Sequence, residues 1–107
     1  MYAETEIKRL AEKLVDKFNP EKVIVFGSQA KGTADEKSDI DFCVVADVEN
    51  SDKRKIRGDI HSYLIWDCDS ELPLDILLYT SFEWAKRQDD RGDFAHIIKR
   101  NGVVLHG

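Results

Sequence analysis

Apolar residues recur at every third or fourth position near the start of the chain, from Ile7 to Phe18. This spacing places them on one face of a helix and predicts an amphipathic helix over residues 2–18. Asn19-Pro20 marks the end of that helix. The next run, residues 23–26, is short, β-branched and fully apolar, which predicts a strand buried on both faces.

Two further apolar runs, residues 40–46 and 74–79, have the length and residue types of strands, and one aspartate interrupts each run. Between them, apolar residues at helical spacing predict a long helix over residues 52–67. Thr80 and Glu83 have the spacing of a capping box, which predicts that a helix starts there. The remaining expectations are a helical turn at 29–33, helices at 81–88 and 91–100, and a short tail or edge strand at 103–105.

This order of elements predicts an α+β fold, or mixed α/β, with a small mixed sheet of about three strands packed against helices. The chain has 107 residues, a length that suits one hydrophobic core. We therefore expect a single domain over residues 1–107.

The charge balance narrows the functional classes. The formal net charge is −5, whereas stable binding to nucleic acid needs a basic surface, so we expect no such binding.

No apolar run reaches the roughly 18 residues of a membrane-spanning helix, and we expect a cytoplasmic protein without a membrane partner. Cys43 and Cys68 lack metal or redox spacing and are expected to be free thiols, with Cys43 buried.

Carboxylates occupy strand positions where the pattern calls for apolar residues. Asp41 and Asp75 each stand inside an apolar run, and burying an unpaired carboxylate costs several kcal/mol. Asp75 could instead belong to an edge strand and face water. Asp39 precedes Asp41 by two positions, so strand alternation points both side chains to the same face. Because hard divalent cations take carboxylate oxygens, Asp39, Asp41 and Asp75 are predicted to share Mg²⁺.

The strand at residues 23–26 ends at Gly27-Ser28. A glycine there lets backbone N–H groups approach a phosphate closely, and the serine hydroxyl adds a donor. A phosphate cradle beside a carboxylate metal site is the arrangement that nucleotidyl transfer requires, because metal ions neutralise the triphosphate and stabilise the leaving pyrophosphate.

Together these residues resemble the signature of the DNA polymerase β-like nucleotidyltransferase superfamily: Gly27-Ser28, ten residues, then Asp39-Ile40-Asp41. More narrowly, the chain is similar to the minimal nucleotidyltransferases, which include the MntA-like antitoxins. That narrower resemblance rests on the stretches Gly27-Ser28-Gln29-Ala30-Lys31-Gly32 and Lys37-Ser38-Asp39-Ile40-Asp41. Asp75 matches the family's third carboxylate. The usual family member has arginine where this chain has Lys31, which keeps the charge without the bidentate fork.

The resemblance implies a polymerase β-like fold and a Mg²⁺-dependent nucleotidyltransferase with ATP as its nucleoside triphosphate substrate. Asp39 and Asp41 would bind metal, two ions in all, and Asp75 would be a ligand or the base for the acceptor. Gly27, Ser28 and Lys31 would bind the nucleotide. The implied setting is a toxin–antitoxin system in which AMP passes to a tyrosine hydroxyl of a partner HEPN-domain toxin.

Two alternatives remain open from the sequence. The chain could neutralise its partner by docking alone, with large aromatics as anchors, although core packing is the simpler role for Trp66, Phe82 and Trp84. Transfer to a small molecule is the other alternative, which the short chain disfavours because little of it remains for a second pocket. The sequence leaves homo- and hetero-oligomers equally open.

Overall fold

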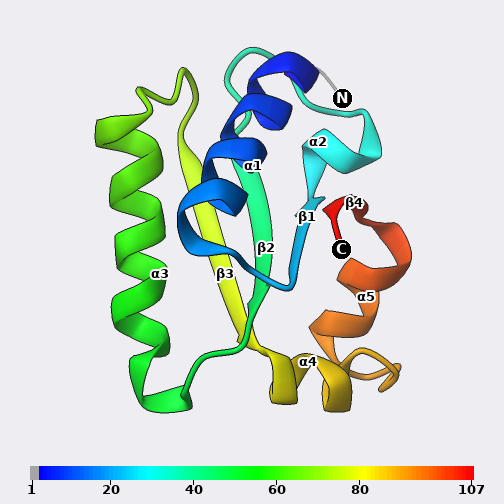
Figure 1. Cartoon of the computed structure of the whole chain (residues 1–107). Coiled ribbons are helices and arrows are strands. Elements are labelled where there is room, and N and C mark those ends of the chain that lie inside the picture. The colour runs from blue at the N-terminus through cyan, green and yellow to red at the C-terminus, as the bar shows by residue number, and fades with distance from the viewer. Residues whose placement is uncertain (1–2) are drawn as a thin grey trace.

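The computed structural model describes residues 3–107 and has a mixed sheet at its centre, with strand order β3-β2-β1-β4 (Figure 1). Strand β1 runs antiparallel to β2 and β4, whereas β2 and β3 are parallel. The elements are α1 (Glu4–Phe18), β1 (Lys22–Phe26), α2 (Ser28–Lys31), β2 (Ile40–Ala46), α3 (Lys53–Ser62), β3 (Leu74–Thr80), α4 (Ser81–Arg87), α5 (Phe94–Asn101) and β4 (Val103–His106).

The expected mixed fold is confirmed, but the sheet has four strands and not about three. The additional strand is β4, which adds to the outer edge of β1. Its apolar stretch is only three residues long, which is too short to distinguish a strand from a tail. Position 2 of the first predicted helix lies outside the described residues; the rest of that helix is α1.

Helices cover both faces of the sheet and form two apolar clusters. On one face, α1 and α3 pack through residues such as Leu10 and Ile60 against Val23, Val25 and the even-numbered residues of β2. On the other face, α4 and α5 pack through Trp84, Ala95 and Ile98 against Ile24, Cys43, Val45 and Tyr79. The burial of β1 on both faces, as its apolar sequence predicts, follows from this three-layer arrangement.

Local signals fix several helix ends. Asn19 ends α1 in the left-handed region at φ 48°. The predicted capping box at α4 is confirmed: the Glu83 N–H donates to Thr80 Oγ1, and the Thr80 N–H donates to Glu83 Oε1, both at 3.0 Å. The helix expected at 52–67 is a short 3₁₀ turn (Asn50–Asp52), α3, and a π-helical turn (Tyr63–Asp67).

The segment that leads into β3 is held against α1 by one buried carboxylate. Glu6 accepts hydrogen bonds from Arg9 Nε at 2.7 Å and from the Glu71 N–H at 2.8 Å. The Arg9 hydrogen bond is the main reason that the pKa of Glu6 lies below its ordinary value, although burial opposes it. This contact positions the chain just before Asp75.

Trp84 is buried, with 2% of its surface exposed, as core packing predicts. The same interpretation is wrong for Trp66 and Phe82, which are 77% and 79% exposed. Trp66 lies in the π-helical turn and Phe82 in the first turn of α4, both directed away from the two clusters. A single aromatic residue belongs to no periodic pattern, so the sequence does not show whether its side chain is buried or exposed.

Cys43 and Cys68 are buried free thiols, and burial raises the pKa of Cys43 to about 12.

Within residues 3–107, no helix is both long and apolar enough to cross a membrane.

Candidate functional site

Asp41 lies near the start of β2, between an aromatic residue on one neighbouring strand and a carboxylate on the other. Its register partner on antiparallel β1 is Phe26, and its partner on parallel β3 is Asp75. Side chains in register on neighbouring strands point to the same face of a sheet. Pairing of the strands therefore brings Asp41 and Asp75 together on one face.

This face is the one that α4 and α5 cover farther along the strands. Cys43 and Val45 follow Asp41 at alternate positions and are fully buried there. Asp41 is half-buried, which places it at the rim of that covered region. The carboxylates lie where β1 ends and where β2 and β3 begin, at the end of the sheet next to α2 (Figure 1).

Of the two placements that the sequence leaves open for Asp75, burial among its apolar neighbours or an edge strand facing water, the structure has the second. Asp75 is exposed, and β3 is an edge strand that, within residues 3–107, pairs only with β2. An apolar run in the sequence does not reveal whether its strand is central or at an edge. The consequence is that Asp75 is accessible from outside the domain.

Asp39 completes the acidic group from just before β2, and its side chain is exposed. The pKa of Asp41 is raised above its ordinary value, first by burial, then by the charge of Asp75, and then by that of Asp39. Asp75 and Asp39 are therefore both close enough to Asp41 to oppose its negative charge. Among residues 3–107, no ion pair involves any of them.

Three neighbouring carboxylates without a cationic partner are a donor set that fits a hard divalent cation. In the described part of the chain, however, no three acidic, histidine or cysteine side chains are grouped as closely as metal ligands would be. The backbone thus brings the three aspartates to one end of the sheet, and their role as metal ligands stays a prediction.

Gly27 packs its backbone directly against Asp41. It has φ 73° and ψ −148°, a conformation that only glycine adopts readily. A Cβ at this position would collide with Asp41 Oδ2. The predicted glycine-serine bend therefore lies beside the carboxylates, and Ser28 begins the short helix α2 immediately after it.

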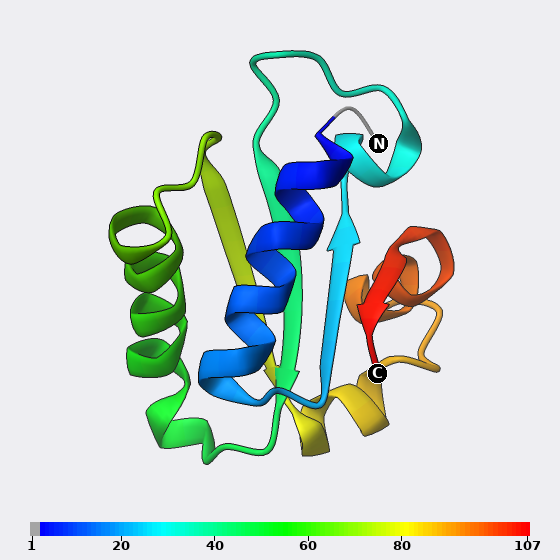
Figure 2. The ribbon, with the colours of Figure 1, turned by 45° about the horizontal axis from the view of Figure 1, so that its top comes forward.

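The loop between α2 and β2, residues 32–39, arches over this end of the sheet (Figure 2). Lys31 ends α2 and is exposed, and within residues 3–107 it forms no ion pair with the three aspartates. The structure therefore places Lys31 next to the bend without bringing it into contact with the carboxylates.

Gln29 is a residue of this region that the sequence interpretation missed. It is fully buried, and its Oε1 accepts a hydrogen bond of 3.4 Å from the Ala3 N–H, which ties α2 to the start of α1. Nothing within the described residues accepts from its Nε2. A four-residue helix is too short to show a periodic pattern, so no sequence signal marks this side chain as buried.

In a comparison with known families, the model described as "Nucleotidyltransferase domain" matches residues 7–99. A search of curated protein sequences gives no match. The matched range includes the bend and all three aspartates. The family match and the similar solved structures confirm the polymerase β-like fold expected from the sequence.

Solved structures with a similar fold include two toxin–antitoxin structures. One is a toxin–antitoxin with AMP-PNP, at TM-score 0.62 and 22% identity, with 94% of this chain and 73% of that chain covered. Another is an MntA-HpeT toxin–antitoxin mutant with two aspartate-to-glutamate substitutions, at TM-score 0.59, 22% identity and the same coverage. A candidate nucleotidyltransferase from Sulfolobus solfataricus gives TM-score 0.58 and 23% identity, covering 94% of this chain and 76% of that one.

Proposed function

The chain belongs to the nucleotidyltransferase domain family, and we propose that it transfers AMP from ATP to a tyrosine hydroxyl of a partner HEPN-domain toxin. One observation carries the proposal: the register places Asp75 beside Asp41 on one face, and the backbone of Gly27 packs on the carboxylate of Asp41. Nucleotidyl transfer needs a carboxylate cation site and a phosphate cradle next to each other, and the aspartates and the Gly27-Ser28 bend offer the groups for both.

The roles follow from the place of each residue. Asp39 and Asp41 would hold two Mg²⁺ ions, and Asp75 would be a further ligand or, as argued below, the base for the acceptor. When bound, these ions would neutralise the triphosphate and stabilise the charge on the leaving group. The Gly27 backbone and the Ser28 hydroxyl would bind the β- and γ-phosphates, and Lys31 would add positive charge at the end of α2.

The acceptor hydroxyl requires a base, and Asp75 is exposed on an edge strand, where a second protein can reach it. In the proposed reaction, the tyrosine oxygen forms a bond to the α-phosphorus of ATP. The bond from that phosphorus to the oxygen bridging to the β-phosphate breaks, and pyrophosphate leaves with the electron pair. Asp75 takes the tyrosine proton, and the products are the O-adenylyl tyrosine and pyrophosphate.

A toxin partner is supported by the two similar structures described as toxin–antitoxin, one of which holds AMP-PNP. In the mutant of that pair, both substitutions replace aspartates, the residue type that the proposed site of this chain relies on. We transfer the toxin context and the nucleotide to this chain as part of the proposal.

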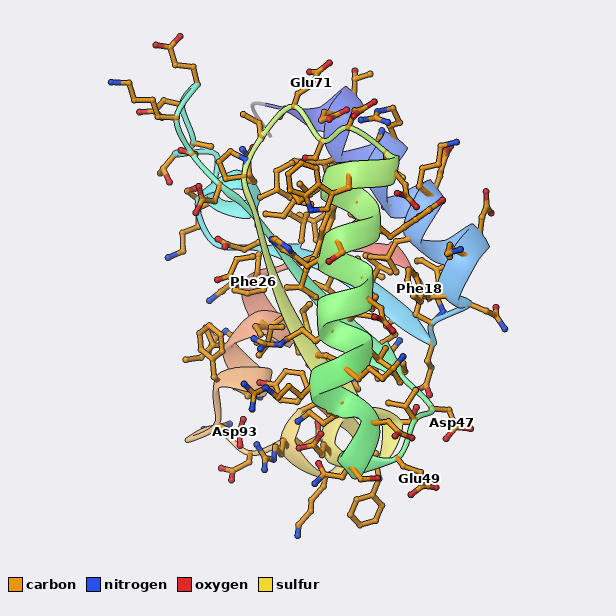
Figure 3. The ribbon with its side chains drawn as sticks, turned by 90° about the vertical axis from the view of Figure 1, so that its left-hand side faces the viewer. Phe18, Phe26, Asp47, Glu49, Glu71 and Asp93 are labelled. Carbon is orange, nitrogen blue, oxygen red and sulfur yellow. The ribbon has the colours of Figure 1, made fainter. Side chains whose placement is uncertain are left out.

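The test is to incubate the purified chain with ATP labelled on its α-phosphate, with MgCl₂ and with the HEPN protein encoded beside it. Label is expected on a tyrosine of the partner. An Asp39→Ala, Asp41→Ala double variant should give no label, whereas Asp47→Ala, Glu49→Ala should label normally. That control pair is exposed and follows β2 at the opposite end (Figure 3). An intact wild-type chain that leaves the partner unlabelled would refute the proposal.

Docking without catalysis is the competing function, and the exposure of Trp66 and Phe82 favours it, since large aromatics are typical interface anchors. The same double variant separates the two functions. If it still neutralises the toxin without labelling it, docking is sufficient; if neutralisation disappears together with the label, transfer is required.

A further inference from the structure

The outer edge of β3 is bordered by a groove that opens next to Asp75. Strand β3 pairs only with β2, so its other backbone edge has no strand partner among residues 3–107. Two adjoining hollows, of about 380 and 360 Å³, follow this edge between β3 and α3. We call them together the β3-edge groove; it is lined by Asn50, Lys53, Arg54, Arg57, Gly58, His61, Ser62 and residues 74–78.

Figure 3 looks onto this side of the molecule. It shows α3 on one side of β3 and Phe26, the register partner of Asp41, on the other. The groove therefore borders the face that carries the aspartates. Arg57 lines both hollows, and Asp75 lines one of them, so a segment lying in the groove would pass directly beside the proposed base.

The helical wall of the groove is basic. Arg54, Arg57 and His61 follow one another at three- and four-residue spacing, and Lys53 stands four residues before Arg57, which places all of them along one side of α3. Within residues 3–107, Lys53 pairs with Glu83 at 2.9 Å, whereas neither Arg54 nor Arg57 has an ion-pair partner. Both arginines are exposed, on a chain whose net charge is −5.

The groove also has room for another chain. A Cβ added at Gly58 would meet no atom within 4 Å, so packing within this domain does not require a glycine there. Glycine in the middle of a helix costs about 1 kcal/mol relative to alanine. In α3 no contact within the domain compensates for this cost, but the missing side chain of Gly58 leaves space in the groove beside Asp75.

We propose that the β3-edge groove binds an acidic segment of the partner protein and thereby delivers the acceptor hydroxyl to Asp75. Arg54 and Arg57 pair with carboxylates of that segment. The edge of β3 offers backbone groups for further hydrogen bonds, apart from the Leu74 carbonyl, which lies 3.2 Å from His61 Nε2. The arginines are positioning residues, because they act on the acceptor and not on the transferred phosphorus. This inference rests on the proposed transfer of AMP to a protein.

The experiment compares two charge reversals of equal size in the full-length chain. Arg54→Glu, Arg57→Glu alters the β3-edge groove. Arg91→Glu, Arg100→Glu alters a second hollow, beside α5, and serves as the matched control. All four arginines are exposed, so both variants should fold. For each, calorimetry gives the dissociation constants of Mg²⁺-ATP and of the neighbouring HEPN protein, and labelled ATP gives KM and kcat for the acceptor.

The groove variant should raise the partner's dissociation constant and the acceptor KM by about tenfold or more, with kcat and ATP affinity changed by less than about twofold. The control should match wild type. Gly58→Gln, which fills the groove without changing charge, should reproduce the higher acceptor KM. A groove variant with wild-type partner affinity would overturn the proposal, as would one that loses ATP affinity, since the groove would then bind nucleotide.

Failure of the proposed function gives a different pattern. If wild type binds the partner without labelling it, AMP transfer is refuted, and the dissociation constants of the variants still decide whether the groove is the docking site. If wild type labels the partner and both charge reversals label it with equal KM, transfer stands and the groove proposal is wrong. A wild-type chain that neither binds nor labels the partner refutes both.

Discussion

Replacing Asp41 by asparagine is expected to lower AMP transfer by roughly 1,000-fold while making the metal-free protein more stable. The loss of rate corresponds to several kcal/mol of transition-state stabilisation, the usual contribution of a metal site. The gain in stability follows from the raised pKa of Asp41: burial, Asp75 and Asp39 all oppose its negative charge. Removing that charge should raise the free energy of unfolding by about 1 kcal/mol, as is common at functional sites.

The measurement pairs the labelled-ATP assay with denaturant unfolding in EDTA. Asp47→Asn is the matched control, because Asp47 directly follows β2 at its other end and is exposed. It should change neither quantity. If the Asp41→Asn protein transfers AMP at the wild-type rate, Asp41 is not part of the catalytic site. If it is less stable than wild type, the repulsion inferred from the raised pKa is wrong.

Gly27→Ala is expected to lower both stability and transfer. The backbone at φ 73° and ψ −148° suits only glycine, which should cost about 1–3 kcal/mol of unfolding free energy. In addition, the new Cβ would collide with Asp41 Oδ2 and displace that carboxylate. Because a misplacement of about 1 Å can cost on the order of 100-fold in rate, we expect a loss of at least that size.

Gly32→Ala isolates the effect of the collision. Gly32 also has a positive φ, 76°, but a Cβ there meets no atom within 4 Å. Its substitution should cost about 1 kcal/mol of stability and leave transfer intact. Equal losses of transfer in the two variants would mean that backbone strain, and not contact with Asp41, explains the effect of Gly27→Ala.

Local chemistry was sufficient to predict the part of the site that lies close together in the sequence. Strand β2 has the predicted bounds, and Asp39, just before it, is close enough to Asp41 to contribute to the raised pKa of that carboxyl. The glycine bend and the Thr80–Glu83 cap are equally local, since each involves residues at most three apart. These features depend on the backbone geometry of short segments, which the residue types encode directly.

Features that depend on strand pairing were not predictable. The sequence gives no register, so the pairing of Asp41 with Asp75 was a hypothesis until the parallel pairing of β2 and β3 was known. The sequence does not give the strand order either, so it did not show that Asp75 lies on an edge strand and is exposed. The β3-edge groove arises from the packing of α3 beside that edge, and in the sequence its arginines look like any solvated helix face.

Calorimetric titration of ATP into the folded chain, once with Mg²⁺ and once with EDTA, tests the central claim most directly, because it needs no partner protein. The three aspartates and the glycine bend predict ATP binding with Mg²⁺, none in EDTA, and none with Mg²⁺ after Asp39→Ala, Asp41→Ala. ATP binding that is the same with and without Mg²⁺, or absent in both, would contradict the claim that these residues form a magnesium-dependent nucleotide site.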